Sequence, residues 1–280
     1  MNENGAFPFG RPNEERPARM VSGASAMVIG VYPSAWHVSW TAPHGLFDDG
    51  LAHGVKALAV DVEPTVFWDG AADDFELRLR AWKEKVGFIE GTHGTISQRS
   101  PSTNGSSGAS VVSHYLAPLG LSAARTAFTD VYPVFLVKSG SGSSRREQGD
   151  AIREDYDSIA ERMGKAQCTL PARIPSGELP TRAVKRFGAR LAADLEAAAA
   201  PLVITLGREV WDTLLLIPTL RARPPCGRFD DLKSTHYGER GSLQVAGRTA
   251  EWLPLVHPGL LKGEASEWAE RHATWRDRQR

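Results

Sequence analysis

The strongest constraint on the fold is the alternation of short, fully apolar runs with longer amphipathic segments along the 280 residues. The clearest example is the run 201–207, which lies between two segments with helical spacing, 181–199 and 208–216. Short runs that are apolar at every position are typical of strands buried on both faces of a parallel sheet. The pattern predicts an α/β fold: a single domain with a central, mostly parallel sheet flanked by helices on both faces.

The remaining segments follow the same alternation. Residues 1–22 are rich in Pro, Asn, Glu and Arg and show no hydrophobic period, so we expect a flexible leader before a domain that spans 23–280. Two Ser/Gly-rich segments, 98–110 and 139–150, are predicted to be loops. Further strands are predicted at 26–31, 55–62, 127–137, 243–246 and 250–256, and further helices at 73–86, 111–119, 150–163 and from 264 onward.

Composition excludes several classes of protein. The 33 basic and 33 acidic residues balance, so bulk electrostatic attraction to nucleic acid is not expected, although a local basic patch remains open. Two cysteines, Cys168 and Cys226, cannot make a cluster held by four thiolates. No membrane-length apolar run and no signal-peptide core stand out, which favours a cytoplasmic protein. Because phosphate-loop, dinucleotide, zinc and nucleophile-elbow motifs are missing, we expect no cofactor and no metal.

Four predicted strand ends carry polar residues beside a turn-forming Pro or Gly, and ligands of parallel α/β sheets bind at such ends. These ends are Gly30-Val31-Tyr32-Pro33-Ser34, Asp61-Val62-Glu63-Pro64, Thr129-Asp130-Val131-Tyr132-Pro133 and Val256-His257-Pro258-Gly259-Leu260.

In their order and placement, three of these ends resemble motifs of the uracil-DNA glycosylase superfamily. Gly30-x-x-Pro33 is similar to the turn that holds the water-activating group of that family. Thr129-Asp130 is similar to its Thr-Asn, whose amide reads the edge of a flipped base, and His257-Pro258-Gly259-Leu260 to its His-Pro-Ser, which bears a catalytic His and a loop that enters the DNA stack. The apolar run 203–207 and the helix after it are similar to the penultimate strand and helix of that superfamily. The resemblance implies a central, mostly parallel four-stranded sheet between helices in a three-layer sandwich. It also implies a monomeric DNA glycosylase with DNA as its partner.

The chain departs from the family where the water activator should stand, because Val31 and Tyr32 occupy the middle of the turn. Hydrolysis of an N-glycosidic bond needs a negative charge near the sugar and a positioned water, and a His can donate a hydrogen bond to the leaving base. We expect His257 to donate the hydrogen bond to the leaving base. An acid after the second predicted strand is expected to supply the negative charge and to position the water. Asp61 is preferred slightly over Glu63 and Asp69. At most one of Asp61 and Glu63 is expected to face the site, and either can instead be a solvated loop charge.

Asp130 stands where the family has Asn, and this difference has a chemical meaning. An amide accepts from N3–H of uracil and donates to O4, whereas an ionised carboxylate only accepts and is repelled by O4. A carboxylate pairs instead with the exocyclic amine of cytosine. Because unmodified cytosine is a hazardous substrate, we expect a further contact to a 5-substituent such as the hydroxymethyl or glucosyl groups of some phage DNA. The alternative is that Asp130 caps a turn and touches no base.

Aromatic and loop residues complete the predicted site. Phe67 and Trp68 are candidates to stack on the base and Tyr32 to line the pocket floor, while core packing is the alternative for the first two. His37 is a further candidate beside the first motif. Leu260 or Leu261 is the expected wedge into the DNA stack. Further DNA contacts are expected from Ser107, Lys138, Arg145 and Lys262, unless their loops are merely flexible.

The sequence therefore predicts a DNA glycosylase that removes a modified cytosine-type base, leaves an abasic site and has a role in antiviral defence. Three alternatives remain open. They are a uracil-excising repair enzyme, a catalytically silent glycosylase fold that binds DNA or protein, and a hydrolase of small N-glycosides.

Overall fold

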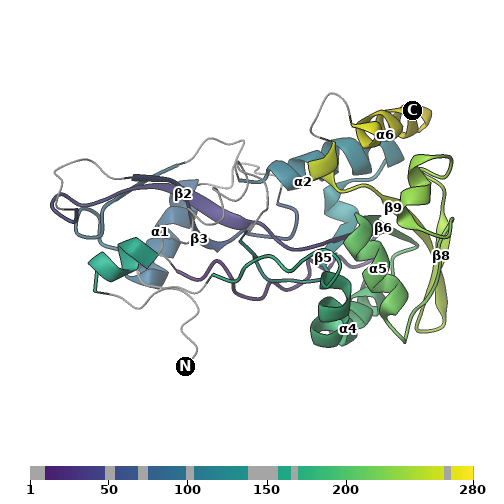
Figure 1. Cartoon of the computed structure of the whole chain (residues 1–280), viewed down its shortest axis with the longest axis horizontal. Helices are drawn as coiled ribbons and strands as arrows, with labels where there is room; N and C mark the ends of the chain where they lie inside the picture. Colours follow the sequence, from purple (N-terminus) through teal and green to yellow (C-terminus); the bar gives the residue numbers. More distant parts are fainter. Residues whose placement is uncertain are drawn as a thin grey trace.

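The computed structural model describes residues 10–47, 54–68, 75–98, 104–137, 157–164, 170–261 and 266–279. Its larger sheet has six strands in the order β5-β1-β6-β9-β8-β7 (Figure 1). The first four are parallel to one another, and β8 and β7 extend the sheet as an antiparallel edge. The chain is thus a mixed α/β protein with a mostly parallel sheet, but with six strands where the resemblance implied four. The bounds are β1 Ala26–Gly30, β5 Thr126–Asp130, β6 Leu202–Leu206, β7 Arg221–Arg223, β8 Gly241–Val245 and β9 Arg248–Leu255.

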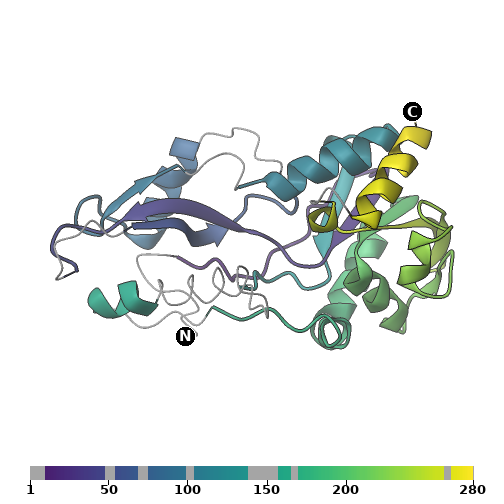
Figure 2. The ribbon, with the colours of Figure 1, turned by 45° about the horizontal axis from the view of Figure 1, so that its top comes forward.

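Helices cover both faces of this sheet. Every residue of β1, β5 and β6 is buried, which explains why these runs carry no polar alternation. Figure 2 shows α2 and α6 on one side of the sheet and α4 with α5 on the other. Helices α4, α5 and α6 confirm the segments predicted at 181–199, 208–216 and from 264 onward, with small shifts at their ends. Helix α2 lies almost wholly in a segment that was predicted to be a loop. The bounds are α2 Ser106–Val111, α4 Leu179–Ala198, α5 Arg208–Leu216 and α6 Glu267–Arg278.

A second sheet of three antiparallel strands, in the order β3-β2-β4, lies at the other end of the long axis with α1 (Figure 1). The prediction that 55–62 belongs to the main sheet is therefore wrong. The sequence analysis missed β2, although its buried Trp36, Val38 and Trp40 alternate with less buried residues, the signal of a strand covered on one face. Trp82 ties α1 to β3 by donating from Nε1 to the Val60 carbonyl at 3.1 Å. The bounds are β2 Ala35–Thr41, β3 Gly54–Val62, β4 Thr95–Ser97 and α1 Phe75–Val86.

The described part of the predicted leader is packed into the fold. Arg19 pairs with Phe128 of β5 through two backbone hydrogen bonds of 2.8 and 2.9 Å. Arg16 is only 3% exposed. Arg16 and Arg19 of the predicted leader are therefore packed into the fold, because backbone pairing to a strand edge needs no hydrophobic period in the sequence.

The Ser/Gly-rich segment 98–110 contains the start of a helix, since α2 begins at Ser106 and continues through η1 (Val112–Leu116) and η2 (Ala117–Leu119). Gly108 allows this helix to pack closely against the backbone of Phe67 and Trp68. A Cβ at Gly108 would lie 2.0 Å from the Trp68 carbonyl oxygen and 2.3 Å from that of Phe67, so only glycine lets the helix pack on this backbone. The predicted strand 127–137 ends at Asp130. Of the predicted helix 150–163, the structure describes 157–163, of which 157–162 are helical.

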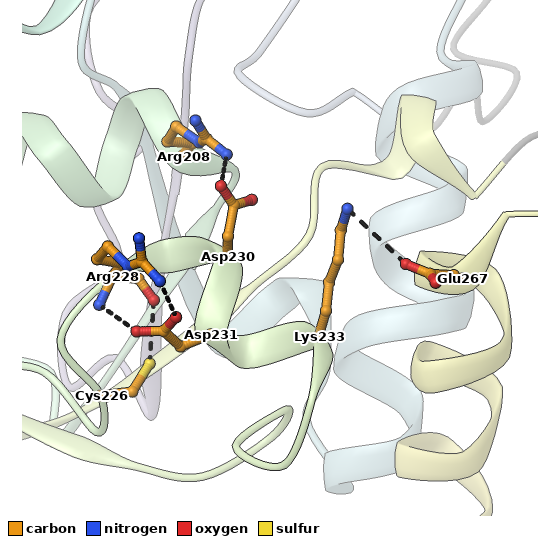
Figure 3. Close-up of polar contacts among 7 residues, drawn as sticks. All are labelled: Arg208, Cys226, Arg228, Asp230, Asp231, Lys233 and Glu267. Atoms are coloured by element: carbon orange, nitrogen blue, oxygen red, sulfur yellow. Dashed lines mark hydrogen bonds and ion pairs between the residues drawn. The ribbon is translucent and has the colours of Figure 1, made fainter.

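Surface ion pairs hold η4 (Phe229–Lys233) against its neighbours (Figure 3). Arg208 at the start of α5 pairs with Asp230, and Lys233 lies 3.9 Å from Glu267 of α6. Exposed pairs of this kind each contribute ~0–1 kcal/mol, so their role here is local positioning. The remaining short helices are η3 Ala123–Arg125 and η5 Pro258–Leu260. Among the described residues, no helix combines the length and apolarity needed to span a bilayer.

Candidate functional site

One pocket of about 280 Å³ opens where β1 and β5 end, between the larger sheet and the start of the smaller one. It brings together side chains from both sheets, from α2 and from the turn after β9. The residues that line it are Val31, Tyr32, Pro33, Ser34, His37, Glu63, Phe67, Ser107, Asp130, Phe135, Leu136, Val137, Arg173 and His257.

Asp130 is the last residue of β5 and is only 2% exposed. It pairs in register with Gly30, the last residue of β1. A Cβ at Gly30 would lie 2.4 Å from Oδ1 of Asp130 and 2.6 Å from Cζ of Phe67, so glycine is required for both side chains to meet at this point. Oδ2 of Asp130 is buried and has no hydrogen-bond partner within the part of the chain that the structure describes. A buried polar atom without a partner is rare and marks a position that a ligand can satisfy.

A charged network on the far side of β5 holds Asp130 in place. Arg190 of α4 donates to the Asp130 backbone carbonyl and, from Nη1, to Oγ1 of Thr129 at 3.1 Å. The same Nη1 lies 2.8 Å from Oδ2 of Asp194, which also accepts from the Thr129 hydroxyl at 2.9 Å. The strand end is therefore fixed through its backbone and through Thr129, and its carboxyl is left to face the pocket.

Glu63 follows β3 directly and is 5% exposed. Its Oε1 accepts from the Gly105 backbone N–H at 3.1 Å. The neighbouring Asn104 is locked onto β2, because its amide accepts from the His37 N–H at 2.9 Å and donates to the His37 carbonyl at 2.8 Å. This bracing ties the start of α2 to the smaller sheet and fixes Glu63 in the pocket wall.

Both buried carboxyls have raised pKa values. Burial raises the pKa of Asp130 to about 7, opposed by the positive charges of Arg16 and Arg190. Burial likewise raises the pKa of Glu63 to about 7, opposed by its hydrogen bond from Gly105 and by Arg16. Acids with pKa values near the working pH are suited to proton transfer and concentrate at functional sites. Arg16 thus contributes to the site from a segment that the sequence analysis assigned to the leader.

His257 lies in the turn between β9 and η5 and is half-buried. Its Nδ1 accepts from the Gly259 backbone N–H at 3.0 Å. A neutral imidazole that accepts at Nδ1 carries its proton on Nε2, so His257 presents an N–H donor on the other side of its ring.

Two buried tyrosines clamp the residue before His257. The Tyr115 hydroxyl donates to the Val256 carbonyl at 2.8 Å, and the Tyr237 hydroxyl accepts from the Val256 N–H at 3.3 Å. Tyr237 also lies 2.7 Å from Nδ1 of His272, whose Nε2 is 3.0 Å from the His114 carbonyl. Since a carbonyl only accepts, Nε2 of His272 donates and Nδ1 accepts from the tyrosine. Burial lowers the pKa of His272 to about 4, which keeps it neutral in this role.

We expect Tyr237→Phe to lower the free energy of unfolding by about 1–3 kcal/mol, because it leaves buried polar atoms on Val256 and His272 unpaired. Urea unfolding at pH 7 measures this loss. The matched control is Tyr132→Phe, which removes one contact to the partly buried Arg186 at 3.2 Å and is expected to lose less. Equal losses in the two variants would contradict the clamp.

Arg173 and Tyr32 form the opposite part of the pocket wall. The Arg173 guanidinium lies over the Tyr32 ring, 4.4 Å from its centroid. Sequence reasoning missed Arg173, because no local pattern in its segment connects it with the strand ends. Phe67 adopts a left-handed backbone conformation with φ of 53° and its ring lies 5.8 Å from that of Phe128. Because such a φ is strained for a non-glycine residue, packing must hold this aromatic side chain at the pocket.

No protein-family model matches this chain, and no curated protein matches it. Within the described ranges, no group of three or more His, Cys, Asp or Glu residues is arranged to hold a metal ion.

Six of the residues predicted from sequence line the pocket, and three others that the structure describes do not. The six are Asp130, Glu63, His257, Tyr32, Phe67 and Ser107, and the weaker candidate His37 joins them. Asp61 lies outside the pocket wall, where Oδ1 accepts from the Val62 N–H at 2.9 Å and from Lys85 at 3.4 Å. The preference for Asp61 over Glu63 is thus corrected, because the strand ends at Val62 and it is Glu63, directly beyond that end, that lies in the pocket wall.

Trp68 packs with the smaller sheet, 5.8 Å from the Arg78 guanidinium, and not in the pocket. Leu260 is 50% exposed on η5. The predicted DNA contacts Lys138, Arg145 and Lys262, and the acid Asp69, lie outside the described residues.

Proposed function

We propose that this pocket is the active site of a DNA glycosylase that hydrolyses the N-glycosidic bond of a flipped, modified cytosine-type base and leaves an abasic site. The observation that carries the proposal is the unpartnered, buried Oδ2 of Asp130 in the wall of a pocket that also contains Glu63 and His257. The volume of about 280 Å³ lies just below the ~300–1,000 Å³ of pockets for drug-sized ligands, which suits one substituted base.

Asp130 is the proposed reader of the base edge. Its carboxyl accepts from the exocyclic amine at C4 of cytosine in either protonation state, and its neutral form also donates to N3. Phe67 meets Asp130 at Gly30, so an aromatic face and a hydrogen-bonding edge are presented to one ligand. Aromatic stacking combined with edge recognition is how base-flipping enzymes hold an extruded base.

Glu63 and His257 are the proposed catalytic pair. The ionised Glu63 orients a water and offsets the positive charge that develops on the sugar, while Nε2–H of His257 donates to the leaving base. Glu63 supplies the acid that is missing between Gly30 and Pro33, although it comes from another strand. The four adjacent parallel strands and the polar residues at their ends support a uracil-DNA glycosylase-like fold. Modified cytosines occur in phage DNA, so we infer a role in antiviral defence.

The test is abasic-site formation by the purified protein on matched oligonucleotides that carry uracil, cytosine, 5-hydroxymethylcytosine or its glucosylated form. Alkaline strand cleavage reports the abasic sites. We expect cleavage only of a modified cytosine substrate. Cleavage of uracil alone would favour the repair enzyme, which is chemically accessible because a neutral Asp130 can donate to O4. No cleavage of any of the four would favour a binding module.

A further inference from the structure

Arg173 is a cation in the pocket wall that has no carboxylate partner among the described residues. Burial lowers the pKa of Arg173, and Glu209, the acid whose charge opposes this effect, forms no ion pair with it. Its Nε is buried without a hydrogen-bond partner in the described part of the chain. Its interaction within the pocket is the contact with the Tyr32 ring at 4.4 Å.

The backbone around Arg173 fixes the guanidinium in this position. The Arg173 N–H donates to the Val137 carbonyl at 2.9 Å, and Ala172 forms a parallel bridge with Val137. Val137 itself is buried and lines the pocket. Backbone pairing therefore fixes the main chain at Arg173, and the Tyr32 ring contacts the guanidinium at the far end of the side chain.

A partly buried cation without a charge partner is destabilising, and an anion that enters the pocket offsets that cost. The planar guanidinium presents its N–H groups in a fork that matches the oxygens of phosphate. A hydroxyl-bearing substituent on the base offers hydrogen bonds but leaves the charge uncompensated. The chemistry of Arg173 thus favours phosphate over a neutral group.

We propose that Arg173 binds a backbone phosphate of the nucleotide whose base enters the pocket, an inference that rests on the proposed glycosylase function. Gly30 pairs with Asp130, and Tyr32 follows two residues later. Because one residue spans at most ~3.6 Å, the backbone that carries the Tyr32 ring begins within about 7 Å of Gly30. Asp130 and Arg173 line the same pocket of about 280 Å³, so the proposal places the base at Asp130 and a phosphate of the same nucleotide at Arg173.

The first experiment asks whether the pocket binds phosphate without DNA. Thermal unfolding is followed in sodium phosphate and in sodium chloride of equal ionic strength for the wild type, Arg173→Met and Arg186→Met. Arg186 is a matched control because it also stacks on an aromatic ring, 4.9 Å from Phe187, but lies outside the pocket wall. We expect phosphate to raise the Tm of the wild type and of Arg186→Met by about 2 °C more than that of Arg173→Met. An equal rise in all three proteins would overturn the anion site.

The second experiment locates the phosphate on DNA. Oligonucleotides with one 5-hydroxymethylcytosine carry a neutral methylphosphonate at one of the phosphates next to that nucleotide. At one of these positions, we expect the methylphosphonate to weaken DNA binding by the wild type about 10- to 100-fold, because a charged hydrogen bond is lost. Arg173→Met is expected to lose a similar factor on unmodified phosphate and nothing further on the methylphosphonate. Arg173→Lys keeps the charge but not the forked geometry of the guanidinium. Its affinity for the unmodified oligonucleotide is expected to be intermediate, which tests the anion site even if Arg173→Met does not fold.

The outcomes separate this inference from the proposed function. An Arg173-dependent effect of phosphate with no base excision would retain the anion site and reject the glycosylase. Base excision with the same methylphosphonate loss in the wild type and in Arg173→Met would reject the anion site alone.

Discussion

Asp130→Asn is expected to reduce excision of a cytosine-type base by about 10- to 100-fold and to create measurable excision of uracil, since a good base contact contributes ~1–3 kcal/mol of discrimination. The carboxyl accepts from the C4 amine, whereas an amide donates to O4 of uracil and accepts from N3–H. Both rates are measured by alkaline cleavage on matched oligonucleotides. The control is Asp212→Asn, because Asp212 is another acid with a pKa raised by burial but lies outside the pocket wall. Unchanged base preference in Asp130→Asn would reject Asp130 as the reader.

The same variant has an expected signature in stability against pH. Asp130 has a pKa of about 7 in the folded protein against an ordinary value of 3.8, so the folded state holds its proton more tightly than the unfolded state. Stability of the wild type therefore falls as the pH rises from about 4 to about 7. We expect Asp130→Asn to be more stable than the wild type at pH 8 by an amount on the order of 2 kcal/mol, and to lose that advantage at pH 4. Urea unfolding at the two pH values measures the difference.

Glu63→Gln is expected to lower kcat for excision by about 100- to 10,000-fold, the range for loss of a positioned acid–base group. KM is expected to change little, because the proposed contacts to the base come from Asp130 and Phe67. Asp61→Asn is the matched control, since Asp61 lies two residues away on the same segment but outside the pocket wall. A large loss in Asp61→Asn with full activity in Glu63→Gln would reverse the assignment.

The pH dependence of the reaction provides a second readout of Glu63. Since its pKa is about 7 and the proposed role needs the ionised form, kcat of the wild type is expected to rise through neutral pH. Ionisation of Asp130 over the same range is expected to disfavour uracil relative to cytosine-type bases, because a carboxylate is repelled by O4. Two interacting acids titrate as a pair, so the profile is assigned by repeating it with each variant.

Local patterns predicted the elements that are buried on both faces or along one stripe. The predicted bounds of β6, α4 and α5 agree with the structure to within about two residues. Continuous apolar sequence and helical spacing reflect burial directly. The smaller sheet was not predicted. Residues 55–62 read as one more buried strand, and only their pairing with β2 separates them from the parallel sheet.

The site divides in the same way between local and long-range information. Asp130 and His257 were identified from the sequence, because a polar residue at the end of an apolar run marks the edge of a parallel sheet where ligands bind. The choice between Asp61 and Glu63 depended on the sheet that their strand joins. Arg16 and Arg173 reach the site from segments with no apolar period, so no sequence pattern indicated that they belong to it. Burial and charge pairing arise between residues distant in sequence, and for that reason only the tertiary structure decided which carboxyl faces the pocket and which cations surround it.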